Sequence, residues 1–227
     1  MDFLDTTWFK THGRTRHFPT PEHLRSLVKL FEPPTPVKFE DLGLIVKFGS
    51  HVSVTEAINL WAIRRVFQDM IPVPEVYGWR VLEREGKTCE VFIYMQLVEG
   101  PTLAQQWPEL SATDKHTICS DLRAKVSCLR SLRDSESQHV IDNGPIVFTH
   151  GDLRPANVIV TDTSPTKIVA ILDWEMAGWY PDYWEDCKAR FTASLGGEWR
   201  GWIDQFLDPN TEALEAFDFY TCSLGKF

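Results

Sequence analysis

THGDLRPAN (residues 149–157) is the stretch that decides the fold, together with ILDWE (residues 171–175) further along the chain. Asp152 and Asn157 flank a proline, so we expect one tight loop to carry both side chains. Asp173 follows a short apolar run, which predicts a position at the end of a strand. An amide oxygen and a carboxylate placed side by side are hard ligands that suit Mg²⁺ bound to substrate phosphates. The second carboxylate, on Asp152, is then available to orient a hydroxyl group and accept its proton.

The order of these residues, His-x-Asp-x-x-x-x-Asn followed by Asp, is that of the catalytic and metal loops of kinases. In phosphoryl transfer, positioning and charge neutralisation supply most of the rate, and these residue types can provide both. Two unrelated polar loops in a globular domain are the alternative interpretation of the same residues.

A glycine follows His150, and residues 173–175 read Asp-Trp-Glu. With these features the sequence resembles the aminoglycoside phosphotransferase/choline kinase-like family, and within it the small-molecule-kinase-like proteins common in fungi. The resemblance implies a bilobal protein-kinase-like fold of the α+β class. Residues 1–98 would form an N-terminal arm and an antiparallel-sheet N-lobe that binds nucleotide. Residues 99–227 would form a mainly helical C-lobe. It also implies an enzyme that uses ATP and Mg²⁺ to phosphorylate a hydroxyl group of a small molecule.

The resemblance implies a role for each polar residue of the motif. Asp152 would be the catalytic base, and Asn157 and Asp173 would hold Mg²⁺. Arg154 would neutralise the γ-phosphate, although a salt bridge explains this arginine almost equally well. His150 is expected to be structural.

Acidic residues around the second motif are a further set of candidates. Glu175 would support the metal site from outside the ligand shell. The carboxylates of Asp182, Glu185 and Asp186 are candidates for facing a substrate amine.

The resemblance extends to the N-terminal part of the chain. IVKFG (residues 45–49) resembles the strand whose lysine contacts the α- and β-phosphates of ATP, which assigns that role to Lys47. Glu56 would pair with Lys47 from the following helix. The alternative is that Glu56 caps its own helix, because Ser53-x-x-Glu56 has the pattern of a capping box.

The stretch FIYMQLVEG (residues 92–100) resembles the segment that joins the two lobes. By resemblance, the main-chain carbonyl of Gln96 and the amide of Val98 would bind adenine. A plain edge strand is the alternative, since backbone contacts leave no side-chain signature.

Two features depart from the family pattern. No glycine-rich loop precedes Lys47, and the candidate connection at residues 32–36 is proline-rich and acidic. The run from Leu132 to His150 is short where the family carries an insertion that helps build the acceptor site. A catalytically inactive kinase-fold binding or regulatory protein, with a protein partner, and a truncated gene product are therefore alternatives. A protein kinase ranks below these, because no Ala-Pro-Glu follows Asp173.

Composition narrows the class of partner. The chain has 227 residues, a net charge of −9 and five cysteines. The acidic balance argues against nucleic acid or an anionic membrane as partner, since both need clustered Lys and Arg, and it is compatible with a cationic substrate. The cysteines form no Cys-x-x-Cys pair, which predicts reduced thiols and a cytoplasmic protein. No secretory signal and no apolar run near the roughly 20 residues of a membrane span are present.

Hydrophobic periodicity predicts the main elements of the fold. We expect an irregular or helical arm at the N-terminus and two tryptophan-rich helical segments at the C-terminus. The predicted strands are 37–39, 44–48, 76–83, 90–97, 158–161 and 168–172, and the predicted helices are 53–69 and 111–133.

Overall fold

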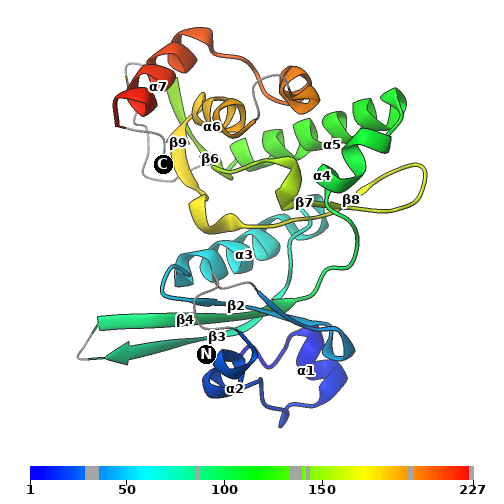
Figure 1. The fold of residues 1–227 in the computed structure, drawn as a ribbon, viewed down its shortest axis with the longest axis vertical. Coiled ribbons are helices and arrows are strands. Elements are labelled where there is room, and N and C mark those ends of the chain that lie inside the picture. The colour runs from blue at the N-terminus through cyan, green and yellow to red at the C-terminus, as the bar shows by residue number, and fades with distance from the viewer. Residues whose placement is uncertain (29–35, 85–86, 133–139, 142–143, 194–196, 225–227) are drawn as a thin grey trace. The chain divides into compact units, whose positions relative to one another are not determined.

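The computed structural model describes the chain except for residues 29–35, 85–86, 133–139, 142–143, 194–196 and 225–227. It divides into two compact units, Met1–Glu99 and Gly100–Phe227 (Figure 1). Most of the predicted proline-rich connection at residues 32–36 therefore lies outside the described residues. The fold is of the α+β class, with helices and antiparallel sheets in each unit.

The first unit is built on a four-stranded antiparallel sheet. The strands have the order β1-β2-β4-β3, and β1 turns into β2 through a short 3-10 helix, η1 (Glu40–Leu42), that ends at Gly43 in a left-handed conformation with φ 56°. β3 and β4 form the predicted hairpin, with Arg84 paired to Lys87. The strands are β1 (Val37–Phe39), β2 (Leu44–Gly49), β3 (Val76–Arg84) and β4 (Lys87–Gln96).

The two faces of this sheet are covered by different helices (Figure 1). One face carries α3 (Val54–Phe67), which starts at the N-cap Ser53 and is followed by the short η2 (Gln68–Met70). The other face carries α1 (Thr7–His12) and α2 (Pro21–Leu27). The N-terminal arm is therefore helical and packed.

Aromatic side chains attach this arm to the sheet. Trp8, Phe9 and Phe18 are buried in one cluster with Phe92 and Tyr94 of β4. The ring of Phe18 stacks on that of Tyr94 with centroids 4.5 Å apart. Burial of these large apolar rings stabilises the packing of the arm on the sheet, because each removes roughly 150–250 Å² from water.

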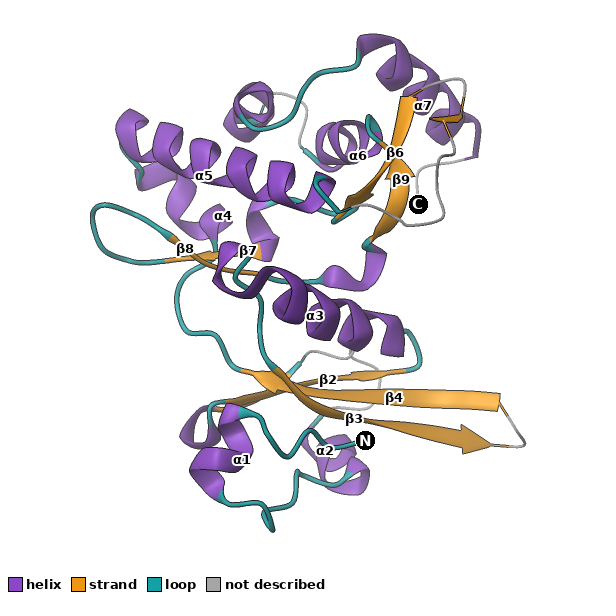
Figure 2. Cartoon of the chain, turned by 180° about the vertical axis from the view of Figure 1, so that it is seen from behind, coloured by secondary structure: helices purple, strands orange, loops and turns teal. Residues whose placement is uncertain are grey.

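The second unit combines helices with two short antiparallel strand systems (Figure 2). β7 and β8 form the predicted pair, whereas the pairing of β6 with β9 was not predicted. The strands are β5 (Val140–Ile141), β6 (Gly144–Thr149), β7 (Val158–Val160), β8 (Ile168–Ile171) and β9 (Gly178–Pro181). The helices are α4 (Leu103–Gln106), η3 (Trp107–Glu109), α5 (Ala112–Arg130), η4 (Pro155–Asn157), η5 (Trp174–Met176), α6 (Trp184–Thr192), η6 (Glu198–Gln205) and α7 (Thr211–Leu224).

Helix α5 supplies the central apolar stripe of this unit. Its predicted stripe of Ile118, Leu122, Val126 and Leu129 is buried, at 0–7% exposure. The N-cap Ser111 accepts a hydrogen bond from the amide of Asp114, 3.1 Å away, as its position before the apolar period predicts. Among the described residues, none of the helices has both the length and the apolar character that crossing a membrane requires.

The buried cysteines of the second unit are expected to be unreactive. Burial raises the pKa of Cys119 to about 12 and that of Cys187 to about 11, so neither forms the nucleophilic thiolate near neutral pH. Cys222 is exposed. We expect iodoacetamide at pH 8 to modify Cys222 in the folded protein and to reach Cys119 and Cys187 only in denaturant, as measured by peptide mass spectrometry. Labelling of all three at one rate under native conditions would contradict this packing.

Candidate active site

The THGDLRPAN loop leaves the end of β6 through a sharp turn at Gly151. Gly151 has φ 78°, and a Cβ atom added there would lie 2.6 Å from the main-chain oxygen of Met176. Both the conformation and the close approach require glycine. The pairing of Thr149 with Gly178 brings the two segments together. The glycine after His150 thus allows the candidate catalytic loop to approach the segment that follows Asp173.

Replacing Gly151 with Ala is therefore expected to destabilise the second unit. The positive φ and the clash with a main-chain oxygen together cost about 2 kcal/mol or more, which corresponds to a fall in Tm of roughly 5 °C. Gly201→Ala is the matched control, because a Cβ atom there meets nothing within 4 Å and the backbone is not in the left-handed region. Equal melting temperatures for the two variants in a thermal unfolding experiment would refute the proposed constraint.

Asp152 is held by the two residues that the motif places around it. The Nδ2 atom of Asn157 lies 2.8 Å from Oδ2 of Asp152 and 2.9 Å from its main-chain oxygen. The Nε atom of Arg154 lies 3.0 Å from the same Oδ2. Both donors contact Oδ2, so within the described residues Oδ1 is the oxygen left to accept a proton.

The β7–β8 pair places Asn157 beside the Asp173 segment. Asn157 directly precedes β7, and its main-chain oxygen accepts a hydrogen bond from the amide of Leu172 at 2.7 Å. Val158 pairs with Ile171 in the antiparallel register. The interval between Asn157 and Asp173 in the sequence is therefore the length of one antiparallel hairpin, and closing that hairpin brings both residues to its open end.

Asp173 sits in a backbone conformation that few residues other than glycine adopt. Its φ and ψ are 64° and 62°, in the left-handed region. Such strain in a residue that is not glycine recurs at functional sites. The following Trp174 is fully buried, and its Nε1 donates to the main-chain oxygen of Ile171 at 2.9 Å, which secures the turn.

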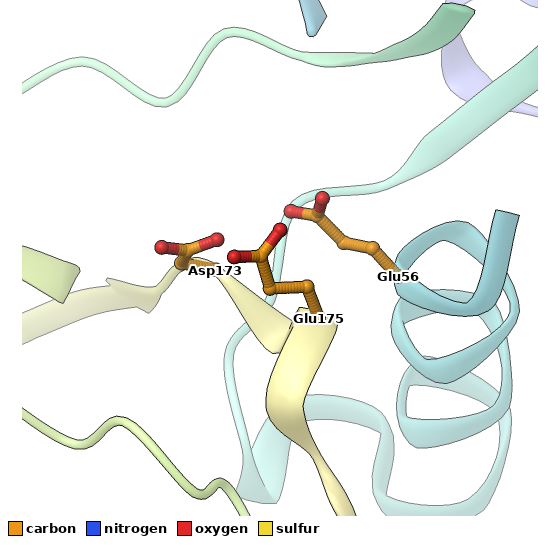
Figure 3. A group of neighbouring side chains, drawn as sticks. All are labelled: Glu56, Asp173 and Glu175. Carbon is orange, nitrogen blue, oxygen red and sulfur yellow. The ribbon is translucent and has the colours of Figure 1, made fainter. Parts of the chain in front are cut away.

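The carboxylates of Asp173 and Glu175 lie close together at this turn (Figure 3). One oxygen of each lies within 4.8 Å of the other. A carboxylate only accepts hydrogen bonds, so Asn157 contacts Asp152 through its side-chain nitrogen. The side-chain oxygen of Asn157 is then the atom that can act as a metal ligand. Two carboxylates and an amide oxygen form a donor set of hard oxygens, and this set fits Mg²⁺.

His150 is structural, as expected. Its Nε2 lies 2.9 Å from the main-chain oxygen of Leu172, and its Nδ1 accepts from the amide of Asp152 at 3.1 Å. A carbonyl oxygen only accepts, so Nε2 is the donor in this contact. The ring is 1% exposed and packs edge-on against Trp174 at 4.5 Å. His150 therefore links the two motifs.

Glu185 supports the catalytic loop, so the suggestion that it faces a substrate amine is wrong. Its Oε2 accepts from the hydroxyl of Thr149 and from the amide of Gly151 at 3.0 Å, and its Oε1 accepts from the amide of Leu153 at 3.2 Å. The side chain is buried, with 2% of the residue exposed. Three donors of the loop thus converge on one carboxylate. No sequence signal identified this role, because the donors are main-chain groups and a hydroxyl.

Asp186 is likewise structural, and the same suggestion for it is wrong. It is fully buried, and its two oxygens accept from Nε of Arg190 at 2.8 Å and from the amide of Asn210 at 3.3 Å. It therefore joins α6 to the start of α7.

In the first unit, Lys47 and Glu56 form an ion pair. The Nζ atom of Lys47 on β2 lies 2.8 Å from Oε2 of Glu56 on α3, whose side chain is 2% exposed and is drawn in Figure 3. A buried carboxylate requires such a counter-charge. The predicted pairing of Glu56 with Lys47 is therefore present. At the start of the same helix, the N-cap hydroxyl of Ser53 accepts from the amide of Thr55 at 3.1 Å.

Gln96 and Val98 lie where β4 ends. The amide of Gln96 donates to the main-chain oxygen of Glu75 at 2.8 Å, and its side-chain oxygen accepts from the amide of Glu75 at 3.3 Å. Val98 follows in the segment that leads out of the first unit. Their contacts with adenine stay predictions.

Comparison with known proteins identifies one family over part of the chain. Residues 120–186 match the model of the phosphotransferase enzyme family, APH. The matched stretch runs from within α5 to the start of α6 and contains Asp152, Asn157, Asp173 and Glu185. A search of curated proteins finds no match. The match thus supports a kinase-like phosphotransferase of the aminoglycoside phosphotransferase type, and the residues that build the catalytic loop lie within it.

Proposed function

We propose that this protein transfers the γ-phosphate of ATP to a hydroxyl group of a small molecule. The observation that carries the proposal is the β7–β8 hairpin, which joins Asn157 to the Asp173 segment while Asn157 also holds Asp152. In this proposal the base and the metal ligands belong to one hairpin and the loop that leads into it. The match of residues 120–186 to a phosphotransferase family supports the same chemistry.

In this proposal Asp152 orients the acceptor hydroxyl and takes its proton through Oδ1. The acceptor oxygen then forms a bond to the γ-phosphorus, the bond from that phosphorus to the β,γ-bridging oxygen breaks, and ADP leaves. Mg²⁺ bound by Asn157 and Asp173, with Glu175 nearby, would neutralise phosphate charge. Arg154 bears a guanidinium beside the base and would contact the phosphoryl group as it moves.

The first unit would contribute to nucleotide binding through the pair described above. A buried Glu56 fixes the ammonium group of Lys47, and a fixed cation is suited to the α- and β-phosphates. The main-chain groups of Gln96 and Val98 are proposed to bind adenine. The same proposal includes a kinase-like bilobal fold and a relation to fungal members of the family. It also includes a cytoplasmic location and the absence of nucleic-acid or membrane partners.

Thermal unfolding with nucleotide tests the proposal before any acceptor is known. A ligand that binds only the folded state at ten times its Kd adds about 1.4 kcal/mol of stability. We expect ATP with Mg²⁺ to raise the Tm of the wild type, and we expect Asp173→Ala to lose the part of the shift that needs Mg²⁺. Asp162→Ala, an exposed acid in the β7–β8 loop, is the control and should behave as wild type. If millimolar ATP gives the wild type no shift that depends on Mg²⁺, the proposed function is wrong.

A further inference from the structure

A pocket within the second unit lies next to the catalytic loop. Its volume is about 390 Å³, which is within the range of sites for small molecules. Its lining comes from the α4–η3 region, from the loop residues Arg154, Pro155 and Ala156, from Thr192 and Ala193 at the end of α6, and from residues 197–200 at the start of η6. We call it the Arg154 pocket.

Arg154 connects this pocket to the proposed base. Its side chain lines the pocket, while its Nε lies 3.0 Å from Oδ2 of Asp152. The pocket therefore borders the ion pair of Arg154 with Asp152, although Asp152 itself is not among the described lining residues.

The charged groups of the pocket favour an anion. Arg154 and Arg200 both line it. Glu198, the acidic residue of the described lining, is paired with Lys115, whose Nζ lies 2.8 and 3.1 Å from the two carboxylate oxygens. Arg154 is itself paired with Asp152, so Arg200 supplies the excess positive charge of this group, although the chain as a whole has a net charge of −9. Guanidinium groups bind carboxylates through paired hydrogen bonds, and they repel ammonium groups.

Aromatic rings form one wall of the pocket. Trp107 and Trp199 line it and meet edge-to-face, with ring centroids 4.8 Å apart. The Nζ atom of Lys115 lies 5.3 Å from the centre of the Trp107 ring, which helps fix that ring. The Nε1 atoms of both rings are buried and do not face the pocket, so the rings offer it an apolar surface. Such a wall suits a flat ring.

We propose that the Arg154 pocket binds the acceptor, and that the acceptor is a hydroxylated aromatic carboxylate. This inference rests on the proposed function, because the bound molecule is an acceptor only if the protein is a phosphotransferase. It differs from the expectation of a cationic substrate that the acidic composition allowed. Of the three acidic candidates for facing an amine, Glu185 and Asp186 are buried in structural hydrogen bonds and Asp182 is partly exposed. None of the three is in the described lining of the pocket, which includes two arginines.

Two probes that differ in charge test the inference by direct binding. 3-(4-Hydroxyphenyl)propanoate and tyramine share a phenol ring and a two-carbon chain, and they end in a carboxylate and an ammonium group respectively. Isothermal titration calorimetry on the full chain should show the carboxylate binding at least tenfold more tightly than tyramine. Arg200→Gln should weaken the carboxylate by about tenfold, the loss of one charge-assisted contact, and should leave tyramine unchanged. Arg123→Gln, an exposed arginine on α5, is the matched control.

A second variant guards against a folding defect in Arg200→Gln, whose side chain also donates to the main-chain oxygen of Arg190. Ala104 is exposed on α4 and lines the pocket, so Ala104→Trp should fill the space and abolish binding of the carboxylate while keeping the wild-type Tm. Tyramine binding as tightly as the carboxylate, or carboxylate binding unaffected by both variants, would overturn the inference. ATP titrated separately distinguishes the two proposals: probe binding without ATP binding would refute the phosphotransferase and leave the pocket as a carboxylate site.

Discussion

Asp152→Asn is expected to lower the rate of phosphate transfer by about 10²- to 10⁴-fold, the usual contribution of a general base. Asparagine keeps the size of the side chain and one oxygen for the donors from Asn157 and Arg154. It cannot accept the proton of a hydroxyl group. The variant should therefore fold and bind Mg²⁺ and ATP as the wild type does.

ATP hydrolysis, with water as the acceptor, provides the assay when no acceptor has been identified. ADP release is measured for the wild type, Asp152→Asn and the exposed control Asp162→Asn. Full activity of Asp152→Asn would place the base elsewhere. Tight binding of ATP by the wild type with no turnover, even with hydroxylated acceptors, would instead support a kinase-fold binding protein.

Glu185→Ala is expected to cause the largest loss of stability of any substitution considered for this chain. The wild-type carboxylate accepts from the hydroxyl of Thr149 and from the amides of Gly151 and Leu153. Each buried donor that loses its partner costs roughly 1–3 kcal/mol, so the total is about 3–5 kcal/mol or more. A protein of this kind is stable by about 5–15 kcal/mol, so this loss removes much of the margin.

Urea denaturation followed by circular dichroism measures this loss. Glu215→Ala removes an exposed acid on α7 and should change the midpoint little. Glu185→Gln keeps one acceptor oxygen and should fall between the wild type and Glu185→Ala. A Glu185→Ala variant with the midpoint of Glu215→Ala would show that the loop is held by other contacts. If Glu185→Ala instead had wild-type stability and lost affinity for an amine, Glu185 would be a substrate-binding residue.

Local patterns in the sequence predicted most of the elements near the site. The strands on either side of the 161–167 loop were expected from two short apolar runs, and the stripe of α5 was expected from its helical period. The His-Gly-Asp motif located the loop itself. These predictions succeeded because each depends on residues close together in the chain. The pairing of β6 with β9 is a long-range contact with no local signature, so it was not predicted.

The acidic residues after the second motif show the limit of such reasoning. Asp182, Glu185 and Asp186 differ little in their sequence context, yet Glu185 accepts from the catalytic loop and Asp186 from Arg190 and Asn210. Their roles depend on which main-chain groups point at them. Likewise, the negative net charge of the chain was compatible with a cationic substrate, while folding brings arginines to the Arg154 pocket.

The sequence by itself predicted the chemistry proposed for the candidate site: a base at Asp152, metal ligands at Asn157 and Asp173, and the glycine at residue 151. Residue type fixes what a group can donate, accept or coordinate, and the required spacing is that of one hairpin. Only the tertiary structure decided which groups support that chemistry and what surrounds it. In the fold, His150 and Glu185 form hydrogen bonds with main-chain groups around the loop. Two tryptophans and two arginines line one pocket. These contacts join residues far apart in the chain, and their partners are often main-chain atoms that every residue possesses.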